Sequence, residues 1–144
     1  MKTLALSVAV LAAILAPGTR AEEPKAAPAA GTAGVAPVLV DGATARRLVA
    51  AGVKVVDVRS PAEFGEGHVP GAVNIPYDEM GRRSAEIGPA TTPVLLYCRT
   101  GRRSGIAGRT LREKGFTQIY DMKSYDAWTK SERALASPAM PPAN

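Results

Sequence analysis

A single cysteine, Cys98, lies in the segment YCRTGRRSG, where three of the next five residues are arginines. Gly101 can adopt a positive φ, so residues 98–102 can form a tight loop whose free backbone N–H groups converge on an anion. A helix that begins near Arg103 would add the positive end of its dipole. These features favour a thiolate, the nucleophilic form of a cysteine.

An inert cysteine beside a solvated basic helix start is the simpler alternative, because free cysteines are mostly buried and structural. The glycine, the helix start and the charge together favour a reactive thiol. The sequence therefore indicates nucleophilic chemistry at Cys98, next to an anion-binding loop of Arg99, Thr100, Gly101, Arg102 and Arg103, with Ser104 as a supporting residue.

Alternating strand and helix patterns position this loop. Strands are predicted over 38–40, 53–59, 71–76, 92–98 and 116–122. Helices are predicted over 41–52, 78–88, 103–115 and 124–135, with a helical turn at Ser60–Pro61 and Trp128 in the core. This order implies an α/β fold, an open, mainly parallel five-stranded sheet with helices on both faces. Asp57 and Cys98 lie at the carboxyl ends of their strands, where such sheets carry their sites.

The N-terminus has the composition of an export signal followed by a linker. Lys2 precedes an apolar run too short to cross a bilayer as a helix, and small residues predict cleavage after Ala21. Residues 22–37 are rich in Ala, Pro and Gly, as flexible linkers are. We therefore expect a signal peptide over 1–21, a linker over 22–37, one domain over 38–137 and a disordered tail over 138–144. The mature protein would be periplasmic, without a membrane anchor.

Charge and composition indicate neither a nucleic-acid partner nor a cofactor. Removal of residues 1–21 would take away Lys2 and Arg20 and lower the formal charge from +5 to +3. The aromatic residues do not alternate with basic ones, as a base-stacking surface requires. One histidine and one cysteine make no Cys/His cluster, so no metal or organic cofactor is expected.

Two segments, DVRSPAEFGEGHVPGAVNIP (57–76) and LLYCRTGRRSGIAGRTLREKGF (95–116), resemble the single-domain rhodaneses of the small exported kind. The first segment matches the opening Asp-x-Arg and the Gly-His-x-Pro-Gly-Ala of that family. The second segment matches the active-site loop of the family and the helix that follows it. The resemblance covers the whole domain after the linker.

The resemblance implies sulfur transfer through Cys98. In the family, the corresponding cysteine takes a sulfane sulfur from a donor such as thiosulfate, forms a persulfide, and passes the sulfur to cyanide or a thiol. The loop N–H groups of 99–103 would hold the anionic terminal sulfur. Arg99, Arg102 and Arg103 would attract the dianionic donor. The expected partners are thus a small anionic donor and a thiophilic acceptor, and no protein partner is identified.

Two alternatives accompany this interpretation. Cysteine phosphatases place an arginine six positions after the cysteine, but Ser104 holds that position here and Arg103 the fifth. A phosphatase or arsenate reductase is therefore less favoured. A catalytically idle rhodanese-type binding module is also less favoured, because such modules usually lose the cysteine.

Three polar residues of the first segment are predicted to support the site. An ion pair between Asp57 and Arg59 that ties the strand end to the next loop is favoured over a role of Arg59 in the field at the pocket. His68 could be a general base, but a thiolate formed by its loop needs none. Because Pro70 and Gly71 fix a turn after it, a hydrogen-bonded structural role is favoured for His68.

One departure from the family pattern concerns the end of the last strand. Family members commonly carry a Gly-Gly pair a few residues before a tryptophan, whereas this chain has Lys123 and Ser124 before Trp128. If the turn needs a positive φ, one of these two residues is strained, or the turn takes another path. The departure affects the expected wall of the pocket and its acceptor preference.

Overall fold

The computed structural model describes residues 36–136. The predictions for 1–21, for nearly all of 22–37 and for 138–144 lie outside the described residues. The strands are β1 (Val38–Leu39), β2 (Lys54–Asp57), β3 (Val73–Asn74), β4 (Val94–Cys98) and β5 (Ile119–Ser124). The helices are α1 (Gly42–Ala50), α2 (Pro61–Glu66), α3 (Met80–Arg83), α4 (Arg102–Glu113) and α5 (Tyr125–Ala136), with a 3₁₀ turn at Ser84–Glu86.

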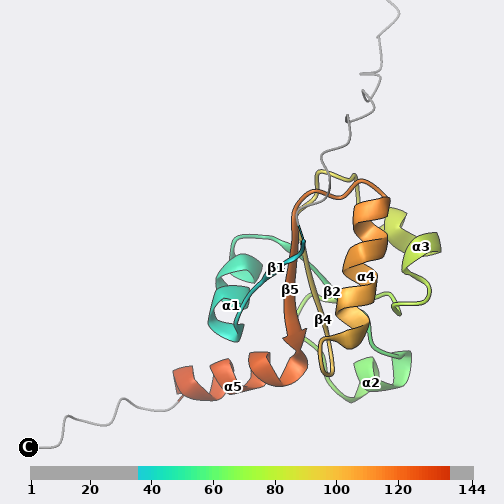
Figure 1. The fold of residues 1–144 in the computed structure, drawn as a ribbon. Coiled ribbons are helices and arrows are strands. Elements are labelled where there is room, and N and C mark those ends of the chain that lie inside the picture. The colour runs from blue at the N-terminus through green and yellow to red at the C-terminus, as the bar shows by residue number, and fades with distance from the viewer. Residues whose placement is uncertain (1–35, 137–144) are drawn as a thin grey trace, which may run out of the picture.

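The five strands form one sheet in the order β1-β5-β4-β2-β3, and every neighbouring pair is parallel. Figure 1 shows α1 and α5 on one side of this sheet and α3 and α4 on the other. The predicted α/β fold is confirmed. Asp57 pairs with Tyr97 in the register of β2 and β4, so the carboxyl ends of these two strands meet at one edge.

Each face of the sheet carries its own hydrophobic core, because neighbouring residues of a strand point to opposite faces. Val56 and Leu96 pack toward the face that also holds Leu111 of α4. Leu95 packs on the other face, in a cluster with Trp128 of α5. Because β2 and β4 are buried on both faces, their sequences are nearly continuous runs of apolar residues.

Local signals set most helix boundaries. The Asp41 carboxylate accepts the Thr44 N–H at 2.7 Å and caps α1. Ser60 and Glu63 form a capping box at the start of α2, with Pro61 in its first turn. The segment 78–88, predicted as one helix, instead divides into α3 and the 3₁₀ turn. Among the described residues, no helix is long and apolar enough to cross a membrane.

The last strand extends further than predicted and is irregular beside Cys98. Leu96 pairs with Asp121, but Cys98 pairs with Ser124, so β5 contains one residue more than β4 over this stretch. Such a bulge redirects the backbone locally. It places residue 123 against the end of β4.

Candidate active site

Cys98 is the last residue of β4 and is fully buried. The chain turns through residues 99–101, and α4 begins at Arg102, one residue before the predicted start. Gly101 has a φ of 96°, and a Cβ there would lie 3.1 Å from the Lys123 Cβ. The positive φ therefore favours glycine at position 101, and the close approach of Lys123 leaves little room for a larger side chain.

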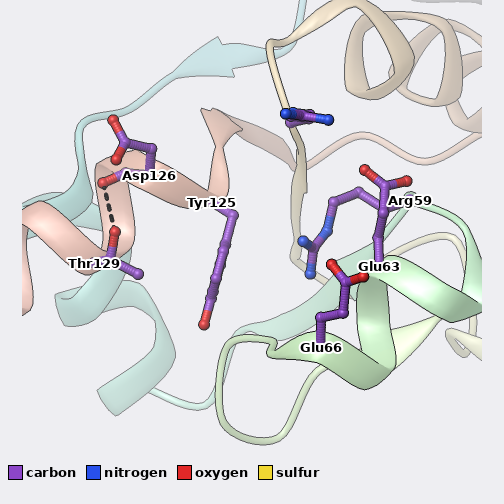
Figure 2. A pocket seen from close by; sticks show the side chains of 7 residues that line it. Arg59, Glu63, Glu66, Tyr125, Asp126 and Thr129 are labelled. Carbon is purple, nitrogen blue, oxygen red and sulfur yellow. Dashed lines mark hydrogen bonds between the residues drawn. The ribbon is translucent and has the colours of Figure 1, made fainter.

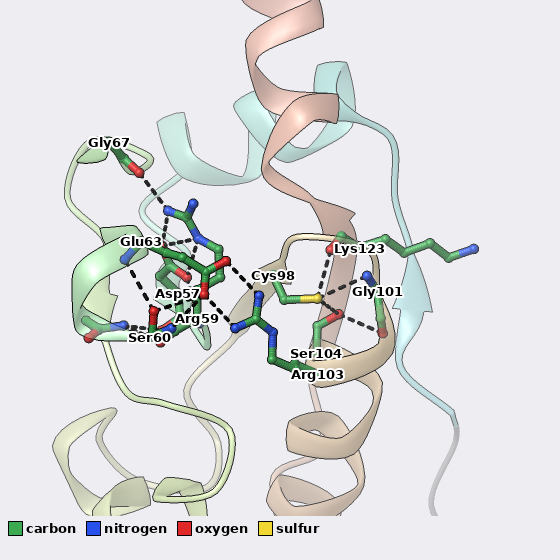
Figure 3. A network of polar contacts seen from close by, with 11 residues as sticks. Asp57, Arg59, Ser60, Glu63, Gly67, Cys98, Gly101, Arg103, Ser104 and Lys123 are labelled. Carbon is green, nitrogen blue, oxygen red and sulfur yellow. Dashed lines mark hydrogen bonds and ion pairs between the residues drawn. The ribbon is translucent and has the colours of Figure 1, made fainter. Parts of the chain in front are cut away.

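Polar groups from the loop, from α4 and from β5 surround the sulfur of Cys98 (Figure 3). The Gly101 N–H donates to Sγ at 3.0 Å. As a thiol, Cys98 can donate its one proton either to Ser104 Oγ at 3.6 Å or to the Lys123 carbonyl oxygen at 3.4 Å. The sulfur thus lies where the loop can supply hydrogen bonds to a negative charge.

The loop shifts the pKa of Cys98 in favour of the thiolate. Burial raises this pKa, but hydrogen bonds from the Ser104 backbone and hydroxyl and from the N–H groups of Thr100 and Gly101 outweigh burial. The pKa is therefore lowered from its ordinary value. A larger fraction of the cysteine is nucleophilic near neutral pH as a result.

Ser104→Ala is expected to raise the pH midpoint of Cys98 alkylation by roughly half to one pH unit, the equivalent of one lost hydrogen bond. The hydroxyl can rotate to donate to a thiolate, and alanine has no such donor. The pH dependence of the iodoacetamide reaction measures this shift. Ser131→Ala is the matched control, because Ser131 Oγ donates instead to the Trp128 carbonyl oxygen. Equal midpoints for both variants would contradict a role of Ser104 at the thiolate.

The three arginines of the loop have different surroundings. Arg99 and Arg102 are exposed. Both terminal nitrogens of Arg103 donate to the Glu63 carboxylate of α2, at 2.6 and 2.8 Å. Hydrogen bonding to Arg103 is the largest cause that lowers the pKa of Glu63 to about 2. Arg103 is therefore part of an ion pair that links α2 to the start of α4.

Glu63 is a site residue that the sequence analysis missed. The Ser-x-x-Glu pattern at 60–63 predicts a capping box, and the structure contains it. The same carboxylate also binds Arg103, forty residues further along the chain. No local pattern in the sequence predicts this second contact.

Asp57 and Arg59 form a buried ion pair beside the site. The Arg59 Nη2 donates to Asp57 Oδ2 at 2.6 Å and to the Gly67 carbonyl oxygen at 2.6 Å. The pair therefore joins the end of β2 to the loop after α2, the role favoured for it from the sequence. His68 is exposed, and its ring stacks on the Phe64 ring with centroids 3.8 Å apart. Its Nδ1 lies 3.0 Å from the Phe64 carbonyl oxygen, which suits a structural residue.

The bulge of β5 contains a strained residue and a second site residue that the sequence analysis missed. Lys123 has a φ of 66°, the only positive φ of a non-glycine residue within 36–136. The buried Asp121 carboxylate accepts the Lys123 N–H at 2.7 Å and so holds this conformation. Burial raises the pKa of Asp121, while the Lys123 N–H opposes that shift. The strain suspected at positions 123–124 is thus located at Lys123, whose carbonyl faces Cys98.

Lys123→Gly is expected to stabilise the fold by about 0.5–1 kcal/mol. Relief of left-handed strain gains roughly 1–2 kcal/mol, and the greater freedom of glycine in the unfolded chain offsets part of it. Urea unfolding measures the difference. Lys130→Gly, an exposed position inside α5, is the control and should lose about 1 kcal/mol. A loss of stability in Lys123→Gly would contradict this prediction. It would show that contacts of the lysine side chain stabilise the fold by more than the strained backbone destabilises it.

A cavity of about 310 Å³ adjoins the loop (Figure 2). Its wall combines residues of α2, of the Cys98 loop and of the start of α5 with Arg59. The lining residues are Arg59, Glu63, Glu66, Arg99, Tyr125, Asp126 and Thr129. The site therefore contains a buried nucleophile, a ring of N–H donors and a neighbouring pocket that carries both signs of charge.

Comparisons with known proteins agree with the fold that carries this site. The model of the family described as Rhodanese-like domain matches residues 42–131. Thiosulfate sulfurtransferase 16, chloroplastic, of Arabidopsis thaliana is 33% identical over 107 residues, which cover 66% of this chain and 89% of that protein. Uncharacterized protein YqhL of Bacillus subtilis (strain 168) is 47% identical over 70 residues, 49% of this chain and 55% of that protein.

Among solved structures, the human single-domain sulfurtransferase TSTD1 is similar in fold, with a TM-score of 0.59 and 28% sequence identity. The similarity covers 67% of this chain and 97% of that chain. The chain thus spans nearly the whole of one single-domain sulfurtransferase and about half the length of YqhL.

Proposed function

The chain belongs to the rhodanese-like domain family, and we propose that it moves a sulfane sulfur from a donor such as thiosulfate to a thiophilic acceptor through a persulfide on Cys98. Membership of the family and the sulfurtransferases among its relatives support an enzyme that transfers sulfur. The observation that carries the finer proposal is the Gly101 N–H, 3.0 Å from the Cys98 sulfur. It belongs to a loop that stabilises negative charge at that point.

In the first half-reaction, the Cys98 thiolate attacks the sulfane sulfur of thiosulfate. A new S–S bond forms, the S–S bond of thiosulfate breaks, and sulfite leaves with the electron pair. The terminal sulfur of the persulfide carries the negative charge, so the loop N–H groups at 99–103 can hold it. The exposed Arg99 and Arg102 supply the positive field that attracts the dianion.

In the second half-reaction, the acceptor attacks the terminal sulfur of the persulfide. The S–S bond breaks and Cys98 leaves as a thiolate, which the same hydrogen bonds stabilise. A lowered pKa of Cys98 therefore assists both halves, because the cysteine is first the nucleophile and then the leaving group.

The purified protein tests this proposal in a thiosulfate:cyanide assay, with phosphatase and arsenate reductase assays on the same preparation. Thiocyanate formation without the other two activities is the expected result. Phosphate release or arsenate reduction without thiocyanate would favour the phosphatase-type alternative. A protein inactive in all three assays would favour the binding module.

Export to the periplasm is a separate proposal, which rests on residues 1–21 alone. N-terminal sequencing of the protein from its native compartment tests it. A start near Glu22 is expected, and a start at Met1 in the membrane fraction would contradict it.

A further inference from the structure

The pocket beside the Cys98 loop contains one unbalanced charge of each sign. Arg59 binds Asp57 at 2.6 Å, Glu63 binds Arg103 at 2.6 Å, and Asp126 binds Lys130 at 2.7 Å. Two charged lining residues remain, Arg99 and Glu66. Within residues 36–136, neither side chain has an ion-pair or hydrogen-bond partner, and both are exposed.

Because these pairs leave one free positive and one free negative charge, the pocket is a poor site for the sulfur donor. A dianion such as thiosulfate would meet Arg99 but also the unpaired carboxylate of Glu66. The pocket is also larger than cyanide requires, since about 310 Å³ is the lower end of the range for small organic ligands. Its charges match a neutral ligand that has a positive and a negative group.

The pocket lies beside the loop that follows the reacting cysteine. Arg99 directly follows Cys98 in the loop. Glu63 lines the pocket and also binds Arg103 at the start of α4, the helix that follows the Cys98 loop. Figures 2 and 3 both show Arg59 and Glu63, which belong to the pocket and to the polar network around Cys98. A ligand held here would have one end near the loop.

We propose that this pocket binds the sulfur acceptor, and that the acceptor is a small thiol with both an ammonium and a carboxylate group, as in a cysteine-type amino acid. The inference rests on the function proposed above. Arg99 binds the carboxylate, Glu66 binds the ammonium group, and Tyr125 forms part of the wall between α5 and the loop. The acceptor thiolate attacks the terminal persulfide sulfur, which leaves as part of a new persulfide, and Cys98 returns to a thiolate.

Discharge of the loaded protein to four thiols tests this proposal. The protein is first loaded with thiosulfate and desalted, and loss of the added sulfur is followed by mass. L-cysteine has both charged groups, N-acetyl-L-cysteine lacks the ammonium, L-cysteine methyl ester lacks the carboxylate, and 2-mercaptoethanol lacks both. Each variant's rate is divided by the parent's rate with the same thiol, so the reactivity of the thiol itself cancels.

Glu66→Gln should slow discharge to L-cysteine and its methyl ester about fivefold relative to 2-mercaptoethanol, the order of one exposed ion pair. Arg99→Gln should slow discharge to L-cysteine and N-acetyl-L-cysteine by a similar factor on the same scale. The matched control is Glu113→Gln at the opposite end of α4, which should affect all four thiols alike.

The proposal is overturned if Glu66→Gln and Arg99→Gln change the four rates by a common factor, as the control does. Loaded protein that discharges to cyanide but shows no such charge pattern would refute the pocket and leave the proposed function standing. Protein that never gains sulfur from thiosulfate would refute both.

Discussion

Cys98→Ser is expected to abolish sulfur loading and thiocyanate formation, with a fall in rate of at least about a thousandfold. A serine hydroxyl cannot be a thiolate, forms no persulfide, and would be a poor leaving group in the second half-reaction. The fold should persist, because the two side chains are nearly equal in size and a serine oxygen can still accept the Gly101 N–H.

The measurement is the steady-state thiosulfate:cyanide rate of the parent and of Cys98→Ser, purified side by side. Thermal unfolding of both proteins is the control for folding. Ser131→Ala, made in the same way, should retain the parental rate, because Ser131 contacts Arg46 and Trp128 rather than the loop. Activity that survives in Cys98→Ser would mean that another group or a contaminating enzyme carries the sulfur.

Asp57→Ala is expected to destabilise the domain by about 3–5 kcal/mol, because it leaves the buried Arg59 guanidinium without its counter-charge. A small domain has a total stability of about 5–15 kcal/mol, so this one change removes a large share of it. Urea unfolding measures the loss. Lys130→Ala breaks the exposed pair with Asp126 and should cost under about 1 kcal/mol. A loss of similar size in both variants would contradict a structural role for the buried pair.

Much of the fold could be predicted because its signals are local. The segment that forms β2 is largely apolar and β-branched, the segment that forms β4 is apolar, and Asp41 and Ser60 mark the starts of two helices. The loop of Cys98 could also be predicted, because Gly101 and the start of α4 follow the cysteine within a few residues. The ends of short elements were predicted less accurately. The strand predicted over 71–76, for example, is the two-residue β3.

The other site residues depend on contacts between segments far apart in the chain. Glu63 reaches Arg103 only because α2 packs beside the start of α4. The Lys123 carbonyl reaches Cys98 because β5 has one residue more than β4 in their register. The sequence showed that positions 123–124 depart from a glycine pair, but the hydrogen bond from Asp121 that holds Lys123 could not be read from it.

The central claim is that Cys98 carries the sulfur, and the intact mass of the protein tests it most directly. After incubation with thiosulfate and desalting, we expect the mass to increase by one sulfur atom, located by peptide mapping on Cys98. Cyanide should then restore the original mass and release thiocyanate. If the protein reacts with iodoacetamide at Cys98 but never gains the mass of a sulfur atom from thiosulfate, the claim that Cys98 carries the sulfur is contradicted.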